Sequence, residues 1–144
     1  MSPLAFILVI VVAFIAGVAS VVDERQFHRP LVACTLMGFA LGDPTTGIML
    51  GGALELIALG WMNVGAAMAP DSALASTISA LVVIQGHQNI DTGIAIAVPL
   101  AAAGQVLTIF VRTITVFFQH QADNFAKTAN FRGIELMHIS GMVL

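Results

Sequence analysis

The chain carries one carboxylate inside a long uncharged stretch. Between Asp43 and Asp71 the only charged residue is Glu55, which lies in an apolar run that favours a helix. An acidic side chain at the centre of a membrane helix costs about 2.5 to 3.5 kcal/mol, so such a residue is by default a candidate functional group. The alternative is a structural role, in which Glu55 is protonated by desolvation or forms an ion pair with Arg112.

Two glycines precede this carboxylate on the same side of the expected helix. Gly47, Gly51 and Glu55 recur at i, i+4 and i+8 and therefore form one ridge. Because glycine has no side chain, another surface can approach the helix backbone closely along this ridge. The surrounding stretch is interrupted by Pro44, Asn63, Gly65 and the pair Pro70-Asp71. Such breaks are typical of discontinuous transporter helices that line a binding site at the bilayer midplane.

Other polar side chains also lie in or beside apolar runs, and most of them are amides or carboxylates. Together they supply the hydrogen-bond donors and acceptors that bind the hydroxyl groups of a sugar. The candidate substrate-binding residues are Glu55, Asn63, Asp71, Gln85, His87 and Gln105. Asp71 also stands where the N-cap of the next helix is expected, and one carboxylate can serve both roles.

The sequence argues against several other kinds of chemistry. His28, His87, His120 and His138 are widely spaced, and no His-x3-His or His/Cys cluster occurs, so we expect no metal site. The sequence contains neither a G-x4-G-K-[ST] loop nor a G-x-S-x-G elbow, which disfavours nucleotide binding and hydrolase chemistry. We therefore predict no catalytic residue and no cofactor. The net charge of -3, spread without a basic cluster, argues against nucleic acid as a partner.

The composition is that of a membrane protein. Of the 144 residues, 58% are hydrophobic and 9% are charged, whereas soluble globular domains carry roughly 25% charged residues. Residues 4–22 contain no charge and would extend about 28 Å as a helix, close to the hydrocarbon thickness of about 30 Å. They lack the basic flank and the cleavage site of a signal peptide, so we predict a transmembrane helix.

Shorter segments follow this helix. Residues 23–30 are expected to form a polar interfacial turn, and residues 31–41 are too few to cross the bilayer alone, so a half-helix or hairpin is expected there. The central part then alternates helices with a loop. We predict helices over residues 47–62 and 72–84, separated by a loop over residues 63–69.

The second half of the chain holds the longest apolar run. After a polar break at residues 85–91, residues 92–118 are mostly apolar but contain Pro99. This run fits either one tilted, kinked span or a re-entrant piece followed by a span. Residues 119–133 are polar, and residues 134–144 form an apolar stretch that stops in mid-run, so we expect a chain truncated at its C-terminal end.

These elements predict an all-α integral membrane protein, a multi-span helical bundle with broken or re-entrant helices. Four of the five basic residues are Arg25, Arg29, Lys127 and Arg132. The positive-inside rule therefore places both polar segments on the cytoplasmic side of the membrane and the N-terminus outside.

Three stretches of the chain resemble a known family. They are DERQFHRPLVACTLMGFALGD (residues 23–43), GIMLGGALELIALGWMNVGAAMAPDSALAS (residues 47–76) and IAVPLAAAGQVLTIFVRT (residues 96–113). Together they are similar to the membrane IIC component, or permease subunit, of the mannose-type bacterial sugar phosphotransferase system. Because that component is considerably longer than this chain, the resemblance implies that residues 1–144 are the N-terminal part of a polytopic sugar-permease (IIC) domain.

The resemblance also implies a function and partners. It implies a multi-pass protein of the bacterial inner (plasma) membrane that carries a hexose of the mannose or glucose type across the lipid bilayer. Its expected partners are a IID membrane subunit and a cytoplasmic IIAB phosphocarrier with a phosphohistidine, in a higher oligomer. The IIC component of such a system looks like a carrier without a phosphorylated residue. We therefore expect this chain to be non-catalytic by itself within a phosphoenolpyruvate-dependent, group-translocating complex.

Two other classes of function stay open from the residues alone. In an ion-coupled transporter or channel subunit, Glu55 and Asp71 would bind cations. A scaffold for another membrane protein would need none of the embedded polar residues. Amides outnumber carboxylates in the embedded set, which favours a neutral, hydroxylated substrate.

Overall fold

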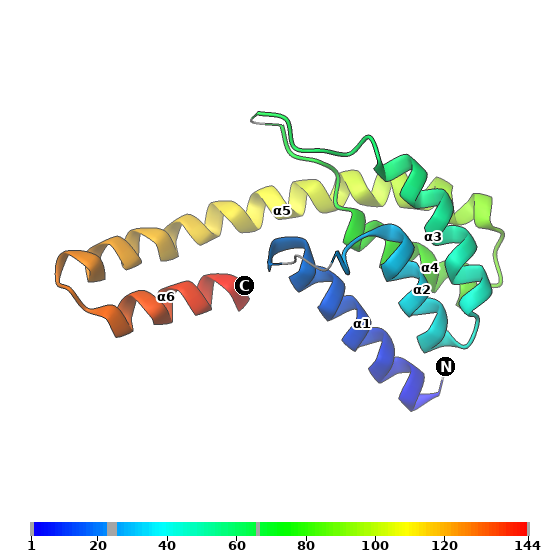
Figure 1. Ribbon diagram of the computed structural model, residues 1–144, viewed down its shortest axis with the longest axis horizontal. Helices are drawn as coiled ribbons and strands as arrows, with labels where there is room; N and C mark the ends of the chain where they lie inside the picture. Colours follow the sequence, from blue (N-terminus) through cyan, green and yellow to red (C-terminus); the bar gives the residue numbers. More distant parts are fainter. Residues whose placement is uncertain (1, 23–25, 66, 144) are drawn as a thin grey trace. The chain divides into compact units, whose positions relative to one another are not determined.

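The computed structural model describes residues 2–22, 26–65 and 67–143, and these residues are mostly helical. The helices are α1 (Pro3–Val22), α2 (Pro30–Leu41), α3 (Pro44–Ala58), α4 (Ser72–Gln85), α5 (Ile90–Lys127) and α6 (Phe131–Val143) (Figure 1). The all-α fold predicted from the sequence is confirmed. Asp23, Glu24 and Arg25 of the predicted interfacial turn lie outside the described residues.

The chain divides into two compact units. The first, Met1–Gln105, contains α1 to α4 and the first part of α5, and the second, Val106–Leu144, contains the rest of α5 together with α6. Within the second unit, a Cβ atom added to Gly133 would lie 2.6 Å from the ring of Phe125. The start of α6 therefore packs directly on the end of α5.

Two of the described helices are long and apolar enough to cross a bilayer. They are α1, over Pro3–Ser20, and α5, which has 38 residues. Helix α5 is continuous, with Pro99 inside it, so residues 92–118 lie in one helix rather than in a re-entrant piece followed by a span. The helix also continues through the polar residues 119–127, because polar side chains such as glutamine and lysine are good helix formers.

The helices between these two are short. α2, α3 and α4 have 12, 15 and 14 residues. At about 1.5 Å per residue they extend about 18 to 23 Å, which is less than the hydrocarbon thickness of about 30 Å. The short α2 agrees with the expectation of a half-helix or hairpin. Several of the candidate polar residues, such as Glu55, Asp71 and Gln85, lie at or near the ends of these helices.

The predicted bounds of the third helix were wrong at both ends. The helix begins at Pro44, because proline is favoured in the first turn of a helix, where its missing N–H is not needed. It ends at Ala58, two residues before Gly60, a poor helix former. Trp61 therefore lies in the turn that follows α3, where it packs against the core, and not at the end of the helix.

α2 and α3 form a tight hairpin along the predicted glycine ridge. Gly42 ends α2 in the left-handed conformation (φ 86°), which glycine adopts without strain. Asp43 begins α3 by accepting hydrogen bonds from the backbone N–H and the hydroxyl group of Thr46. A Cβ atom at Gly47 would lie 2.5 Å from the carbonyl oxygen of Cys34. The prediction that another surface approaches this ridge closely is confirmed, and that surface is α2.

The core of the first unit lies where α2, α3 and α4 meet. Met37, Leu50 and Val83 are the largest apolar side chains buried there. α4 contributes mainly small side chains, including the buried Ser76 and Ser79, so that the helices can approach closely. The core fixes the ends of the short helices relative to each other.

Candidate functional site

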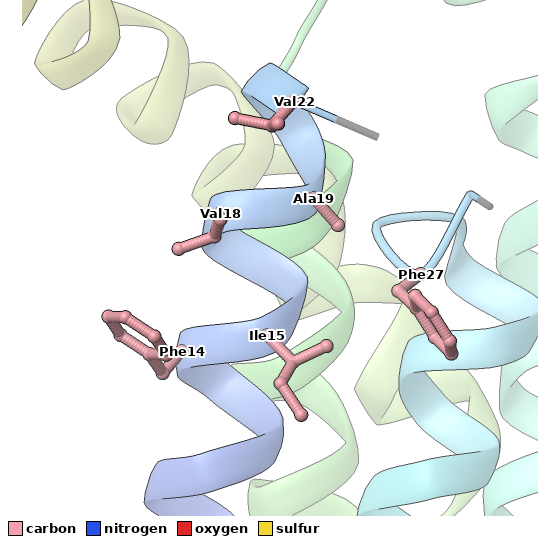
Figure 2. A pocket seen from close by; sticks show the side chains of 6 residues that line it. All are labelled: Phe14, Ile15, Val18, Ala19, Val22 and Phe27. Carbon is pink, nitrogen blue, oxygen red and sulfur yellow. The ribbon is translucent and has the colours of Figure 1, made fainter. Parts of the chain in front are cut away.

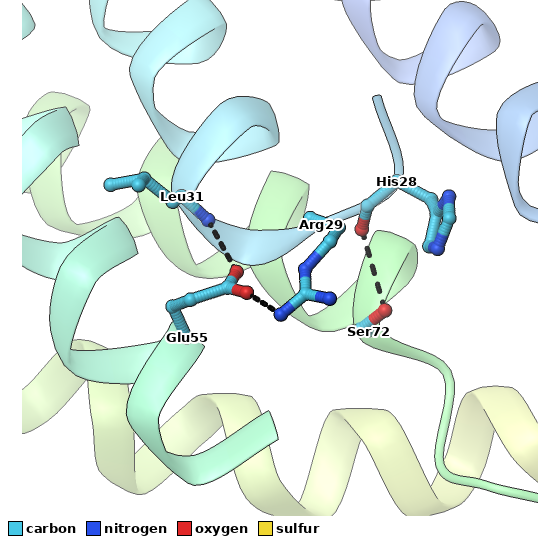
Figure 3. A network of polar contacts seen from close by, with 5 residues as sticks. All are labelled: His28, Arg29, Leu31, Glu55 and Ser72. Atoms are coloured by element: carbon cyan, nitrogen blue, oxygen red, sulfur yellow. Dashed lines mark hydrogen bonds and ion pairs between the residues drawn. The ribbon is translucent and has the colours of Figure 1, made fainter. Parts of the chain in front are cut away.

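The embedded carboxylate of α3 forms an ion pair at the start of α2. Glu55 Oε1 bonds the guanidinium group of Arg29, and Glu55 Oε2 accepts a hydrogen bond of 3.2 Å from the backbone N–H of Leu31 (Figure 3). The side chain of Glu55 is 17% exposed and that of Arg29 is 36% exposed. Within the first unit, the partner of Glu55 is therefore Arg29, whereas Arg112, the partner considered from the sequence, belongs to the second unit.

Residues 28–31, which lead into α2, also contact α4. Ser72, the first residue of α4, donates its hydroxyl hydrogen to the carbonyl oxygen of His28, at 3.3 Å (Figure 3). Residues 28–31 are thus held by α3 on one side and by α4 on the other. Figure 3 shows the two contacts on neighbouring residues of this segment.

Asp71 caps α4, as the sequence predicted. Its Oδ1 atom accepts a hydrogen bond of 3.0 Å from the backbone N–H of Leu74. Its own backbone N–H donates to the carbonyl oxygen of Ala101 in α5, also at 3.0 Å. A Cβ atom at Gly104 would lie 2.7 Å from the Cβ atom of Asp71. The glycine therefore allows α5 to pack directly on the capping residue.

Two amides hold the loop that leads into α4. Gln105 donates from Nε2 to the carbonyl oxygen of Met68, at 2.6 Å. Asn63 accepts through Oδ1 from the backbone N–H of Ala69, at 2.7 Å. Each amide uses one of its two polar atoms in this contact, so the other atom can bind a substrate hydroxyl group.

Gln85 and His87 lie elsewhere. Gln85 is the last residue of α4, whereas Asp71 stands just before the first. The length of the helix separates the two by about 21 Å. His87 follows in the turn between α4 and α5, with a positive φ of 49°, and both side chains are exposed. The structure thus places Asp71, Asn63 and Gln105 at the start of α4 and on the loop before it, and connects Glu55 to this region only through residues 28–31. Gln85 and His87 lie at the other end of α4.

An apolar groove runs along α1. It has a volume of about 260 Å³ and is lined by Phe14, Ile15, Val18, Ala19, Val22 and Phe27 (Figure 2). None of these side chains has a hydrogen-bonding group, so the groove does not suit a sugar. Among the described residues, no group of three His, Cys, Asp or Glu side chains could hold a metal ion.

Sequence reasoning missed Arg29 and Ser72 as members of this site. Arg29 counted only as one of the basic residues that set the topology. Two signals could have identified it: it directly precedes Pro30, which favours the start of a helix, and Glu55 is the nearest embedded carboxylate downstream of it. A cation at the N-terminal end of a short helix can form an ion pair with a carboxylate embedded in a neighbouring helix.

The fold and the site define an α-helical membrane protein in which polar groups gather at the ends of short helices. More particularly, the chain belongs to the family described as the sorbose-specific IIC component of the phosphotransferase system, whose model matches residues 3–144. The resemblance read from the three sequence stretches is thereby confirmed.

Relatives at high identity support this assignment. The chain is 66% identical to the fructose permease IIC component of Bacillus subtilis (strain 168), over 99% of this chain and 53% of that protein. It is 62% identical to the mannose-specific EIIC component of Escherichia coli (strain K12), over 99% and 54% of the two chains. The chain thus spans about half the length of the curated relatives that it matches.

A solved structure shares the fold. It is a cryo-EM structure of the mannose transporter ManYZ in complex with microcin E492. The TM-score is 0.94 at 62% sequence identity, and the match covers 99% of this chain and 57% of that one.

Proposed function

We propose that this chain belongs to the permease subunit of a phosphoenolpyruvate-dependent sugar phosphotransferase system, and that it carries a hexose across the membrane for phosphorylation by a partner subunit. Membership of the IIC family supports this proposal, as do relatives named for fructose, sorbose and mannose, which are all hexoses. In this proposal the chain binds and moves the sugar and performs no catalytic step by itself.

One observation carries the proposal: the side chains of Asp71, Asn63 and Gln105 contact backbone groups at the start of α4 and in the loop before it, and residues 28–31 connect this region to Glu55. Glu55 comes from α3, Asp71 precedes α4 and Gln105 comes from α5. We propose that Asp71, Gln105 and Asn63 contact the hydroxyl groups of the sugar, with Glu55 beside them. Gln85 and His87, at the other end of α4, would meet the sugar at a different point along its path.

The remaining assignments follow from the family. We propose a IID membrane subunit, a cytoplasmic IIAB phosphocarrier and the lipid bilayer as partners, in a higher oligomer within the bacterial inner membrane. The chain would be the N-terminal part of a longer, multi-pass IIC domain, in agreement with the half-length match to its relatives. The solved mannose transporter has the composite name ManYZ, and this supports a second membrane component beside the IIC chain.

An ion-coupled transporter is the competing class, and one contact weakens it. Arg29 neutralises Glu55, which removes one of the two carboxylates that would bind a cation. Uptake of labelled mannose, fructose and sorbose would separate the two classes. The measurement uses cells that contain the IID and IIAB partners, with and without this subunit, and with and without an uncoupler. We expect subunit-dependent uptake that survives uncoupling. Uptake that disappears with the proton gradient would refute the proposal.

A further inference from the structure

The first turn of α2 has no cap of its own. Arg29 occupies the N-cap position but makes no side-chain capping hydrogen bond there, and Pro30 has no N–H to donate. The first available donor is the N–H of Leu31, and its acceptor is Glu55 Oε2, from the neighbouring helix. Glu55 thus caps α2 across the hairpin.

This cap depends on Arg29. An embedded carboxylate left without a partner is strongly destabilising, whereas a paired one can hold its position. Arg29 donates to Oε1 of Glu55, and Oε2 accepts from the N–H of Leu31. The Glu55 side chain therefore forms both the ion pair and the helix cap. Both oxygens of Glu55 are therefore engaged within the hairpin.

The cap is connected to the residues proposed to bind sugar. The carbonyl oxygen of His28, next to Arg29, accepts the hydroxyl hydrogen of Ser72, and Ser72 follows Asp71 directly. Asp71 is fixed on its other side by Ala101 and Gly104 of α5. A shift of residues 28–31 would therefore move the first turn of α4 and the Asp71 carboxylate with it.

We propose that Arg29 is a positioning residue of the sugar site: by holding Glu55 over the first turn of α2, it fixes the start of α4 and so orients Asp71. This inference rests on the proposed function, because it assigns a role in sugar binding. Arg29 itself does not contact the sugar in this account. It acts through Glu55, the 28–31 segment and Ser72.

A charge swap separates this role from simple neutralisation. In the double variant Arg29→Glu, Glu55→Arg the ion pair can form again. An arginine at position 55 has no acceptor for the N–H of Leu31, and glutamate is not among the residues favoured at the N-cap position 29, so this N–H loses its partner. The swap should therefore fail to restore sugar binding. Arg29→Lys keeps the charge and the acceptor, and should restore most of it.

The test measures sugar affinity by calorimetry on the detergent-solubilised permease complex, with mannose, fructose and sorbose as the probes. Arg29→Gln should raise the Kd by about tenfold or more, the loss expected for one hydrogen bond to a charged group. Lys127→Gln makes the same change of charge at an exposed position on α5 and should leave the Kd unchanged.

A second readout does not depend on sugar. Cys34 is the only cysteine of the chain and is 0% exposed, one turn into α2, with its thiol 3.4 Å from the carbonyl oxygen of Ser76. Alkylation of Cys34 by a membrane-permeant maleimide, followed by peptide mass spectrometry, reports loosening of α2 from α3 and α4, which both pack on this residue. Labelling should rise in Arg29→Gln and in the charge swap, but not in Arg29→Lys or Lys127→Gln.

The outcomes are distinct. If labelling rises in Arg29→Gln while the Kd stays the same, the ion pair is only structural and the positioning role is wrong. If neither changes, or if the charge swap recovers fully, the capping argument is wrong. If the unmodified complex binds none of the three hexoses, the proposed function fails and the sugar-site role with it. The labelling pattern would then still decide whether Arg29 holds α2 against α3 and α4.

Discussion

Replacing one glycine of the α2–α3 contact tests how closely these helices pack. A Cβ atom at Gly51 would lie 2.9 Å from the carbonyl oxygen of Pro30 and 3.0 Å from both the Cα atom of Leu31 and the Cβ atom of Cys34. Two of these atoms belong to the backbone, so the helices themselves must move apart. Next to it in α3, a Cβ atom at Gly52 would meet nothing within 4 Å. Gly52→Ala is therefore a matched control.

The two substitutions should change the free energy of unfolding differently: Gly52→Ala should raise it, whereas Gly51→Ala should leave it nearly unchanged or lower it. Alanine is favoured over glycine within a helix by about 0.8 to 1 kcal/mol, and this gain applies to both positions. Overpacking a core by one methyl group costs about 1 to 3 kcal/mol, and this cost applies to Gly51→Ala only. We expect Gly52→Ala to raise the free energy of unfolding by about 1 kcal/mol. We expect Gly51→Ala to be less stable than Gly52→Ala by about 1 to 3 kcal/mol.

The assay is reversible unfolding of the chain in mixed detergent micelles, with increasing SDS and far-ultraviolet circular dichroism as the readout. Comparing the two alanine variants directly removes the helix-propensity effect, because both glycines lie in the middle of the same helix. Equal stability of Gly51→Ala and Gly52→Ala would refute the close approach of α2 and α3. A larger residue, as in Gly51→Leu, should also prevent assembly of the permease on native gels.

The other predictions concern sugar transport. Glu55→Gln should keep the protein in the membrane but lower uptake, since it removes a hydrogen bond between charged groups worth roughly 1.5 to 3 kcal/mol; normal uptake at normal expression would contradict this. Asp71→Asn keeps an N-cap acceptor but loses the charge, so uptake should fall while helical content stays the same; if only Asp71→Ala lowers uptake, capping is the sole role. Gln105→Ala should raise the apparent KM for uptake, because the loop carbonyl of Met68 loses its donor; an unchanged KM would remove Gln105 from the site. His87→Ala should impair uptake only partly, and complete loss would show that the exposed turn after α4 is essential.

Local patterns in the sequence predicted much of this arrangement. The i, i+4 spacing of Gly47 and Gly51 identified the face along which helices meet, because close approach depends only on absent side chains. Asp71 was identified as an N-cap, because capping is a contact between residues three apart. The uncharged residues 4–22 predicted α1, because an apolar run of that length typically forms a transmembrane helix.

Contacts between distant residues could not be predicted in this way. The pairing of Arg29 with Glu55 depends on the register of the α2–α3 hairpin, which the turn at Gly42 sets. The separation of Gln85 from Asp71, by contrast, was implied by the predicted helix over residues 72–84, because the two residues flank that helix at opposite ends. Both residues were nevertheless grouped as candidate sugar ligands, because the grouping used the type of side chain and not its position along the helix.

The central claim, that the sugar crosses the membrane for phosphorylation by a partner, is tested most directly by the chemical state of the sugar after transport. Membrane vesicles containing the permease complex are loaded with the phosphorylated IIAB partner and given radiolabelled mannose, fructose or sorbose. Chromatography then identifies the trapped product. We predict a sugar phosphate, whose build-up requires the phosphohistidine of the partner and persists when the proton gradient is collapsed. Unphosphorylated sugar that accumulates in proportion to the proton gradient would contradict group translocation and establish the ion-coupled class in its place.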